Sequence, residues 1–155
     1  MNINLRILIG LLLLVFITAC DRNVVFEKNL KIPSETWHQD SILKLSTEIS
    51  DTIQLYDIYL NLRHSTQYGY RNFYLFFETI MPDGNIVRDT LECLLADRTG
   101  KWHGSGFGRI KTNSFLFRES VWFPQEGIYH FRMEQAMREE TLEGIIDVGL
   151  RIERK

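Results

Sequence analysis

Apolar and polar side chains alternate along most of the chain, and a period of two indicates β-strands that bury one face. In residues 43–49, Leu, Leu, Thr and Ile alternate with Lys, Ser and Glu. Residues 57–63 and 87–95 repeat the pattern, and residues 72–80 are dense in aromatic side chains. Each of these stretches is therefore predicted to be a strand whose apolar side chains point into a core.

Turn residues separate the predicted strands. Pro82 and Gly84 predict a hairpin, because Pro presets φ and Gly accepts a positive φ. Residues 134–143 are rich in Glu, Gln, Ala, Met and Arg and precede Gly144, which predicts a helix. The predicted fold is all-β: an antiparallel β-sandwich of seven or eight strands with one short helix near the C-terminus. The predicted strands include residues 43–49, 57–63, 72–80, 87–95, 115–123, 128–134 and 145–153.

The size and charge of the chain exclude several classes of protein. A chain of 155 residues and 18.3 kDa has room for one domain of ordinary size. The 18 Lys and Arg residues against 20 Asp and Glu residues give a net charge of −2, which argues against a nucleic-acid-binding protein. The 2 Cys residues are too few for a disulfide scaffold or a four-thiolate zinc site.

The beginning of the chain has the pattern of a bacterial lipoprotein signal. Arg6 precedes an apolar run over residues 7–17, which is too short to span a membrane and is typical of a secretory signal peptide. A buried core helix is the alternative, but the run has no polar face. Residues 17–20 read Ile-Thr-Ala-Cys and resemble a lipobox, so Cys20 is predicted to carry the lipid that attaches the chain to a membrane. The predicted organisation is a signal peptide over residues 1–19, a lipidated tether over 20–31 and the β-sandwich domain over 32–155.

The sequence contains no arrangement of residues that indicates catalysis. The four His residues lack the spacing of a metal site. The string Gly104, Gly106 and Gly108 lacks the spacing of a dinucleotide fingerprint, and Ser105 within it lacks that of a nucleophile elbow. Cys93 lies among leucines and is interpreted as a buried, inert thiol. We therefore predict no enzyme activity, no metal, no cofactor and no small-molecule substrate.

The Gly-rich stretch over residues 100–108 is interpreted as a loop that crosses between two sheets. It is longer than a hairpin needs, and loops of this length are often functional. Lys101, Trp102 and Arg109 are candidate partner-binding residues, because Trp and Arg are enriched in interface hot spots. Trp102 is preferred to Trp122 as an exposed contact. Two alternatives stay open: Trp102 caps the sandwich, or it stacks on a sugar in a carbohydrate-binding envelope lipoprotein.

Short segments throughout the chain match the pattern of one bacterial family. They are Trp37-His38-Gln39-Asp40, Asn61-Leu62-Arg63-His64, Asn72-Phe73-Tyr74-Leu75-Phe76, Pro82-Asp83-Gly84, Asp89-Thr90-Leu91-Glu92, Leu95-Ala96-Asp97, Gly100-Lys101-Trp102-His103-Gly104-Ser105-Gly106, Gln135-Ala136-Met137-Arg138, Gly144-Ile145 and Asp147-Val148-Gly149-Leu150-Arg151. With these segments and the lipobox, the chain resembles the gliding-motility lipoprotein family GldH.

The resemblance implies a cell-envelope lipoprotein, lipidated on Cys20, that is needed for gliding in bacteria that use type IX secretion. It implies no enzymatic activity, and it implies partners among the other gliding motility envelope proteins. The domain is expected to face the periplasm or the cell surface. Whether the lipid lies in the inner or the outer membrane stays open, because sorting rules at Asp21, which follows Cys20, differ between bacterial groups.

Overall fold

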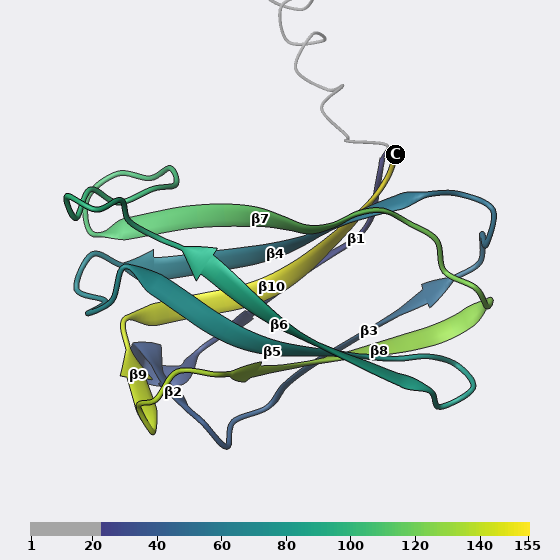
Figure 1. Cartoon of the computed structure of the whole chain (residues 1–155), viewed down its shortest axis with the longest axis horizontal. Helices are drawn as coiled ribbons and strands as arrows, with labels where there is room; N and C mark the ends of the chain where they lie inside the picture. The colour runs from purple at the N-terminus through teal and green to yellow at the C-terminus, as the bar shows by residue number, and fades with distance from the viewer. Residues whose placement is uncertain (1–22) are drawn as a thin grey trace, which may run out of the picture.

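The computed structural model describes residues 23–155, and ten strands form within this range (Figure 1). Eight of them build two four-stranded antiparallel sheets that face each other, and two form a small third sheet. Sheet 1 pairs β1 (Val24–Lys31), β10 (Ile145–Arg154), β4 (Tyr56–Ser65) and β7 (Ile110–Val121) in that order. Sheet 2 pairs β3 (Leu43–Ile49), β8 (Gly127–Gln135), β5 (Asn72–Ile80) and β6 (Ile86–Leu94). The small sheet pairs β2 (Thr36–His38) with β9 (Thr141–Glu143).

The hydrophobic core lies between sheets 1 and 2, where the inward-facing side chains of both sheets are buried. On β4 of sheet 1, Leu60 and Leu62 have no exposed surface. On β5 of sheet 2, Phe73 and Leu75 are equally buried. The period of two in the sequence has its physical cause here, because one face of each strand packs against the opposite sheet.

The predicted helix over residues 134–143 is wrong. The segment instead ends β8 at Gln135 and forms β9 after a short bend. Within the bend, Nε2 of Gln135 donates a hydrogen bond to the carbonyl oxygen of Glu139 at 2.8 Å, and its Oε1 accepts one from the N–H of Met137 at 2.9 Å. Strand pairing and this buried amide therefore override the helix propensity of the residue types present.

The strand count in the described residues also exceeds the predicted seven or eight, because β1, β2 and β9 carry no clear signal in the sequence. β1 runs from Val24 to Lys31 and pairs with β10, although sequence analysis assigns these residues to the tether. Residues 24–31 therefore form an edge strand of sheet 1. A 3-10 turn, η2 (Pro33–Glu35), then joins β1 to the short strand β2.

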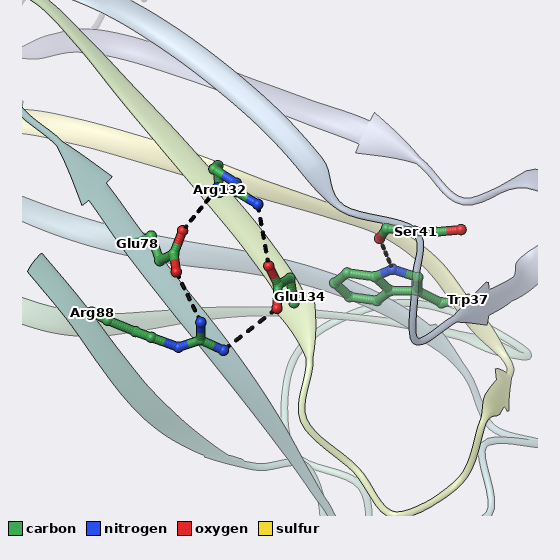
Figure 2. A network of polar contacts seen from close by, with 6 residues as sticks. All are labelled: Trp37, Ser41, Glu78, Arg88, Arg132 and Glu134. Atoms are coloured by element: carbon green, nitrogen blue, oxygen red, sulfur yellow. Dashed lines mark hydrogen bonds and ion pairs between the residues drawn. The ribbon is translucent and has the colours of Figure 1, made fainter. Parts of the chain in front are cut away.

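Trp37 fixes the small sheet to the core. Its side chain is 1% exposed, and its ring centroid lies 5.8 Å from that of Phe73 on β5. Figure 2 shows its indole Nε1 donating a hydrogen bond to the carbonyl oxygen of Ser41, at 2.7 Å. The buried indole thus has its single donor satisfied, as a Trp in a core requires.

The predicted signal peptide over residues 1–19 and the predicted lipid attachment at Cys20 lie outside the described residues. Within residues 23–155, no helix combines the length and the apolar character that crossing a bilayer requires. Both ends of the described chain come together, because the N–H of Arg154 donates a hydrogen bond to the carbonyl oxygen of Asn23 at 2.8 Å. The start of β1 and the C-terminus accordingly occupy one corner of the sandwich (Figure 1).

Candidate functional site

The candidate partner-binding residues lie in the loop over residues 95–109, which crosses from β6 in sheet 2 to β7 in sheet 1 (Figure 1). Oδ1 of Asp97 organises the first turn, because it accepts hydrogen bonds from the N–H of Thr99 at 2.8 Å and of Lys101 at 3.0 Å. The hydroxyl of Thr99 also donates to this carboxylate, and this bond in particular holds the pKa of Asp97 below its ordinary value. The loop is therefore held by its own hydrogen bonds.

Gly104 and Gly106 let the loop lie directly on β7. Both have positive φ, at 80° and 130°. A Cβ at Gly104 would lie 2.5 Å from the carbonyl oxygen of Thr112, and one at Gly106 would lie 2.4 Å from that of Ile110. Between them, Ser105 exchanges two backbone hydrogen bonds with Thr112, at 2.9 and 2.7 Å. Close backbone packing thus explains the Gly-x-Gly-x-Gly string, and its interpretation as a crossing loop is confirmed.

Trp102 is half-buried and packs against the end of the core. Its ring centroid lies 4.7 Å from that of His64, a β4 residue with no exposed surface. The Nδ1 atom of His64 lies 3.0 Å from the carbonyl oxygen of Ser65, and burial lowers the pKa of His64. Trp102 thus covers the end of the sandwich, which is the first of the two alternatives given in the sequence analysis. Only part of the indole is left accessible for stacking on a sugar.

Arg109 ties the end of the loop to η2. Its guanidinium donates hydrogen bonds to both carboxylate oxygens of Glu35, at 2.9 and 2.6 Å. These bonds lower the pKa of Glu35 and raise the pKa of Arg109. Because 54% of the Arg109 side chain and 34% of the Glu35 side chain remain exposed, water screens the ion pair. The side chain of Lys101 is exposed on the same loop.

Phe107 and Trp122 are exposed aromatic residues that the sequence analysis does not name as binding candidates. Phe107 is fully exposed in the crossing loop, and Trp122 is 61% exposed at the other end of the sandwich. The preference for Trp102 over Trp122 as an exposed contact is therefore wrong. Phe107 stands between two glycines, so its chain neighbours offer no side chain to cover it, and that pattern is visible in the sequence.

Within residues 23–155, no three or more His, Cys, Asp or Glu side chains are placed to hold a metal ion together.

Cys93 is 1% exposed, and burial raises the pKa of its thiol to about 12, so its interpretation as a buried thiol is confirmed. Asp147 is also buried, which raises the pKa of its carboxyl, and its Oδ2 lies 3.1 Å from a guanidinium nitrogen of Arg63. The charge of Arg63 opposes this rise in pKa but does not cancel it, because desolvation by burial is the larger effect.

Comparison with known proteins places the chain among bacterial lipoproteins. A family described as GldH lipoprotein matches residues 24–152. The gliding motility lipoprotein GldH of Flavobacterium johnsoniae is 36% identical over 155 residues, covering 94% of this chain and 96% of that protein. A gliding motility lipoprotein GldH homolog of Christiangramia forsetii is 34% identical over 148 residues, covering 91% of this chain and 90% of that protein.

A solved structure of the infectious bursal disease virus Gx strain also aligns, with a TM-score of 0.33 and 11% identity. The alignment covers 83% of this chain and 32% of the viral chain. Its TM-score is too low to bear on fold or function. The sequence matches, in contrast, extend over nearly the whole described domain at more than 30% identity. The chain therefore belongs to the GldH lipoprotein family, and it is a lipid-anchored lipoprotein of the cell envelope whose relatives are named for gliding motility.

Proposed function

We propose that the chain is a non-enzymatic accessory component of the gliding motility machinery, linked to type IX secretion and held at a membrane by lipid on Cys20. The family match over residues 24–152 carries this proposal, together with the relatives' names. Two or more acyl chains anchor a protein stably. The anchor then raises the effective concentration of the domain at partners on the same membrane, so a weak interface is enough for assembly.

The same proposal includes docking of other gliding motility envelope proteins on the crossing loop, residues 95–109. Its support is that hydrogen bonds from Asp97 and the two bonds between Ser105 and Thr112 order the loop before any partner binds. A preordered loop loses less conformational entropy on binding. The loop presents exposed Lys101 and Phe107. Trp102 and Arg109 lie on the same loop.

A deletion strain tests the proposed function. Loss of the protein is expected to abolish spreading on agar and to reduce secretion of type IX cargo. The unaltered gene should restore both, whereas Cys20→Ser should not, because a hydroxyl does not replace the thiol as acyl acceptor. Normal spreading and normal secretion in the deletion strain would contradict the proposal.

The docking surface is tested separately with variants that leave the fold intact. Phe107→Ser and Lys101→Ala change exposed side chains, so the free energy of unfolding should stay within about 0.5 kcal/mol while spreading is lost. Arg109→Ala should behave in the same way, because its ion pair is screened by water. Trp102→Ala serves as the packing control, since it uncovers His64 and should lower the melting temperature. Normal spreading with the first three variants at normal abundance would remove the docking proposal.

A further inference from the structure

The distance between the lipid and the folded domain is short, given the lipidation of Cys20 proposed above. β1 begins at Val24, and the carbonyl oxygen of Asn23 already accepts a hydrogen bond from Arg154 of the neighbouring strand. Three peptide links separate Cys20 from Asn23, and consecutive Cα atoms are 3.8 Å apart, so these residues lie at most about 11 Å apart. Covalent geometry alone therefore keeps this end of sheet 1 beside the membrane surface.

The strand register shows which residues share that end. Across sheet 1, Val24 pairs with Glu153, and Arg154 pairs with Tyr56. Tyr56 in turn pairs with Val121, the last residue of β7. The start of β1, the start of β4 and the end of β7 therefore lie at the same end of sheet 1. The loop before β4 and the residue after β7 extend from this end, which is also the end that the anchor precedes.

The C-terminus holds the loop before β4 at this end. The N–H of Lys155 donates a hydrogen bond to the carbonyl oxygen of Leu55 at 3.0 Å. Nε2 of Gln54 donates one to the backbone oxygen of Lys155, also at 3.0 Å. Since the N–H of Arg154 is bonded to Asn23, a continuous set of hydrogen bonds connects the anchor side of β1 to Gln54 and Leu55.

Three large apolar side chains are exposed at this end. Ile53 is 92% exposed, Leu55 is 43% exposed and Trp122 is 61% exposed. Trp122 also borders a hollow of about 250 Å³ that Val87 and Phe117 line. Trp side chains favour the interface between water and lipid. Apolar surface that is removed from water on contact with lipid stabilises the membrane-bound state.

We propose that the end of the sandwich formed by Ile53, Leu55 and Trp122 contacts the phospholipid bilayer and fixes the orientation of the domain on it. The anchor brings this end to the surface, and the three side chains enter the interfacial layer. β4 then runs away from the membrane from Tyr56 to Ser65, over about 30 Å. His64 and the Trp102 that covers it lie at the far end, so the crossing loop points away from the lipid.

Quenching of tryptophan emission by brominated lipid tests the proposal. The full lipidated protein is reconstituted into phosphatidylcholine and phosphatidylglycerol vesicles, with or without phospholipid brominated on acyl carbons near the headgroup. Brominated lipid should quench part of the emission. Trp122→Phe should remove most of that quenching, whereas the matched variant Trp102→Phe at the far end should retain it.

A second pair of variants tests the apolar contact itself. Ile53→Asp places a charge at the proposed interface and should reduce quenching of Trp122. Phe107→Asp makes the same kind of change at an equally exposed position on the far end and should leave it unchanged. Because both positions are exposed, both variants should remain folded, which circular dichroism checks.

Mass spectrometry of the same samples separates the two proposals. Lipidated protein whose quenching is unaffected by Trp122→Phe would overturn the orientation proposal and leave the lipid anchor standing. Protein without lipid on Cys20 would overturn both. Equal loss of quenching in Trp122→Phe and Trp102→Phe would also overturn the orientation, because the two ends of the domain would then approach the lipid alike.

Discussion

Gly149 stands at the centre of sheet 1, where the outer face carries a row of polar side chains. It pairs with Asn29 on β1 and with Asn61 on β4. Nδ2 of Asn61 donates a hydrogen bond to Glu27 at 3.0 Å, and its Oδ1 accepts one from Ser114 at 2.8 Å. A glycine between the two asparagines leaves the space that this cross-strand network occupies.

Gly149→Ala should therefore destabilise the domain. The added Cβ would lie 1.8 Å from Oδ1 of Asn29 and 2.5 Å from the carbonyl oxygen of Lys28. The side chain can move but the backbone carbonyl cannot, so the free energy of unfolding should fall by about 1–3 kcal/mol in urea titrations. Gly69→Ala is the control, because nothing lies within 4 Å of its added Cβ. Equal stability of the two variants would contradict the close approach.

His64 makes stability depend on pH. Burial lowers its pKa from 6.5, so the unfolded chain binds a proton at a higher pH than the folded chain does. The free energy of unfolding should therefore fall as the pH drops below about 6.5, until the folded pKa is also passed. Lys111 nearby acts in the same direction, because its charge lowers the same pKa.

Urea midpoints measured between neutral and mildly acidic pH check this expectation. His64→Gln should flatten the decline, whereas His130→Gln, at an exposed position, should preserve it. The contribution of Asp147 to the pH dependence of stability has the opposite sign. Burial raises the pKa of its carboxyl above 3.8, so its protonation in acid stabilises the folded chain relative to the unfolded chain. It is present in all variants, so the comparison isolates His64. An unchanged decline in His64→Gln would assign the pH dependence to other groups.

At the scale of elements, a charge network joins three strands of sheet 2 (Figure 2). Glu78 on β5 lies directly between Arg88 on β6 and Arg132 on β8, with nitrogen–oxygen distances of 2.9 and 3.4 Å. Glu134 lies 3.5 Å from Arg88 and 3.7 Å from Arg132. Opposite charges placed directly across strands stabilise their pairing.

Glu78→Gln should weaken sheet 2 more than Glu134→Gln does. The Glu78 side chain is 12% exposed and makes the shorter contacts, whereas that of Glu134 is 21% exposed. Removing the negative charge of Glu78 leaves the guanidinium groups of Arg88 and Arg132 with less opposite charge nearby. The free energy of unfolding is therefore expected to fall by about 1–2 kcal/mol at low salt. Added sodium chloride should reduce the difference in the free energy of unfolding between Glu78→Gln and the unaltered protein, as measured by urea titration. A larger loss for Glu134→Gln would refute the ranking.

The strands that sequence predicts are those whose burial follows a local pattern. Residues 43–49 and 57–63 alternate because one face of each meets the opposite sheet. β2 and β9 have three residues each, too few to show a period. Gln135 belongs to β8 because it pairs with Leu75, a contact between residues far apart in sequence, and residue propensities do not contain it.

The candidate site shows the same division. The glycines of residues 100–108 indicate a loop, because their conformational freedom is a local property. The exposure of Trp102 and of Trp122 depends instead on distant residues. His64 from β4 covers part of Trp102, whereas Trp122 follows the last residue of β7 at the end of the sheet. Local sequence therefore identifies the loop but not which indole faces water.

At the scale of the whole molecule, the start of β1 limits the distance between the folded domain and the proposed lipid anchor at Cys20. A tether over residues 20–31 would reach about 40 Å when extended, and either end of the domain could then approach a membrane. Because β1 takes up Val24–Lys31, only residues 21–23 separate Cys20 from the sheet. The orientation proposed here is thus a consequence of strand pairing between β1 and β10.

Lengthening the tether should release that orientation. A flexible Gly/Ser linker of about 20 residues inserted between residues 22 and 23 adds a mean reach of roughly 25 Å, so the anchor no longer holds the Trp122 end at the lipid. Quenching of Trp122 by brominated lipid should then fall, while the protein stays in the membrane fraction. The same linker appended after Lys155 leaves the tether unchanged and should preserve the quenching. If the inserted linker leaves quenching intact, the affinity of Ile53, Leu55 and Trp122 for lipid, rather than the short tether, sets the orientation.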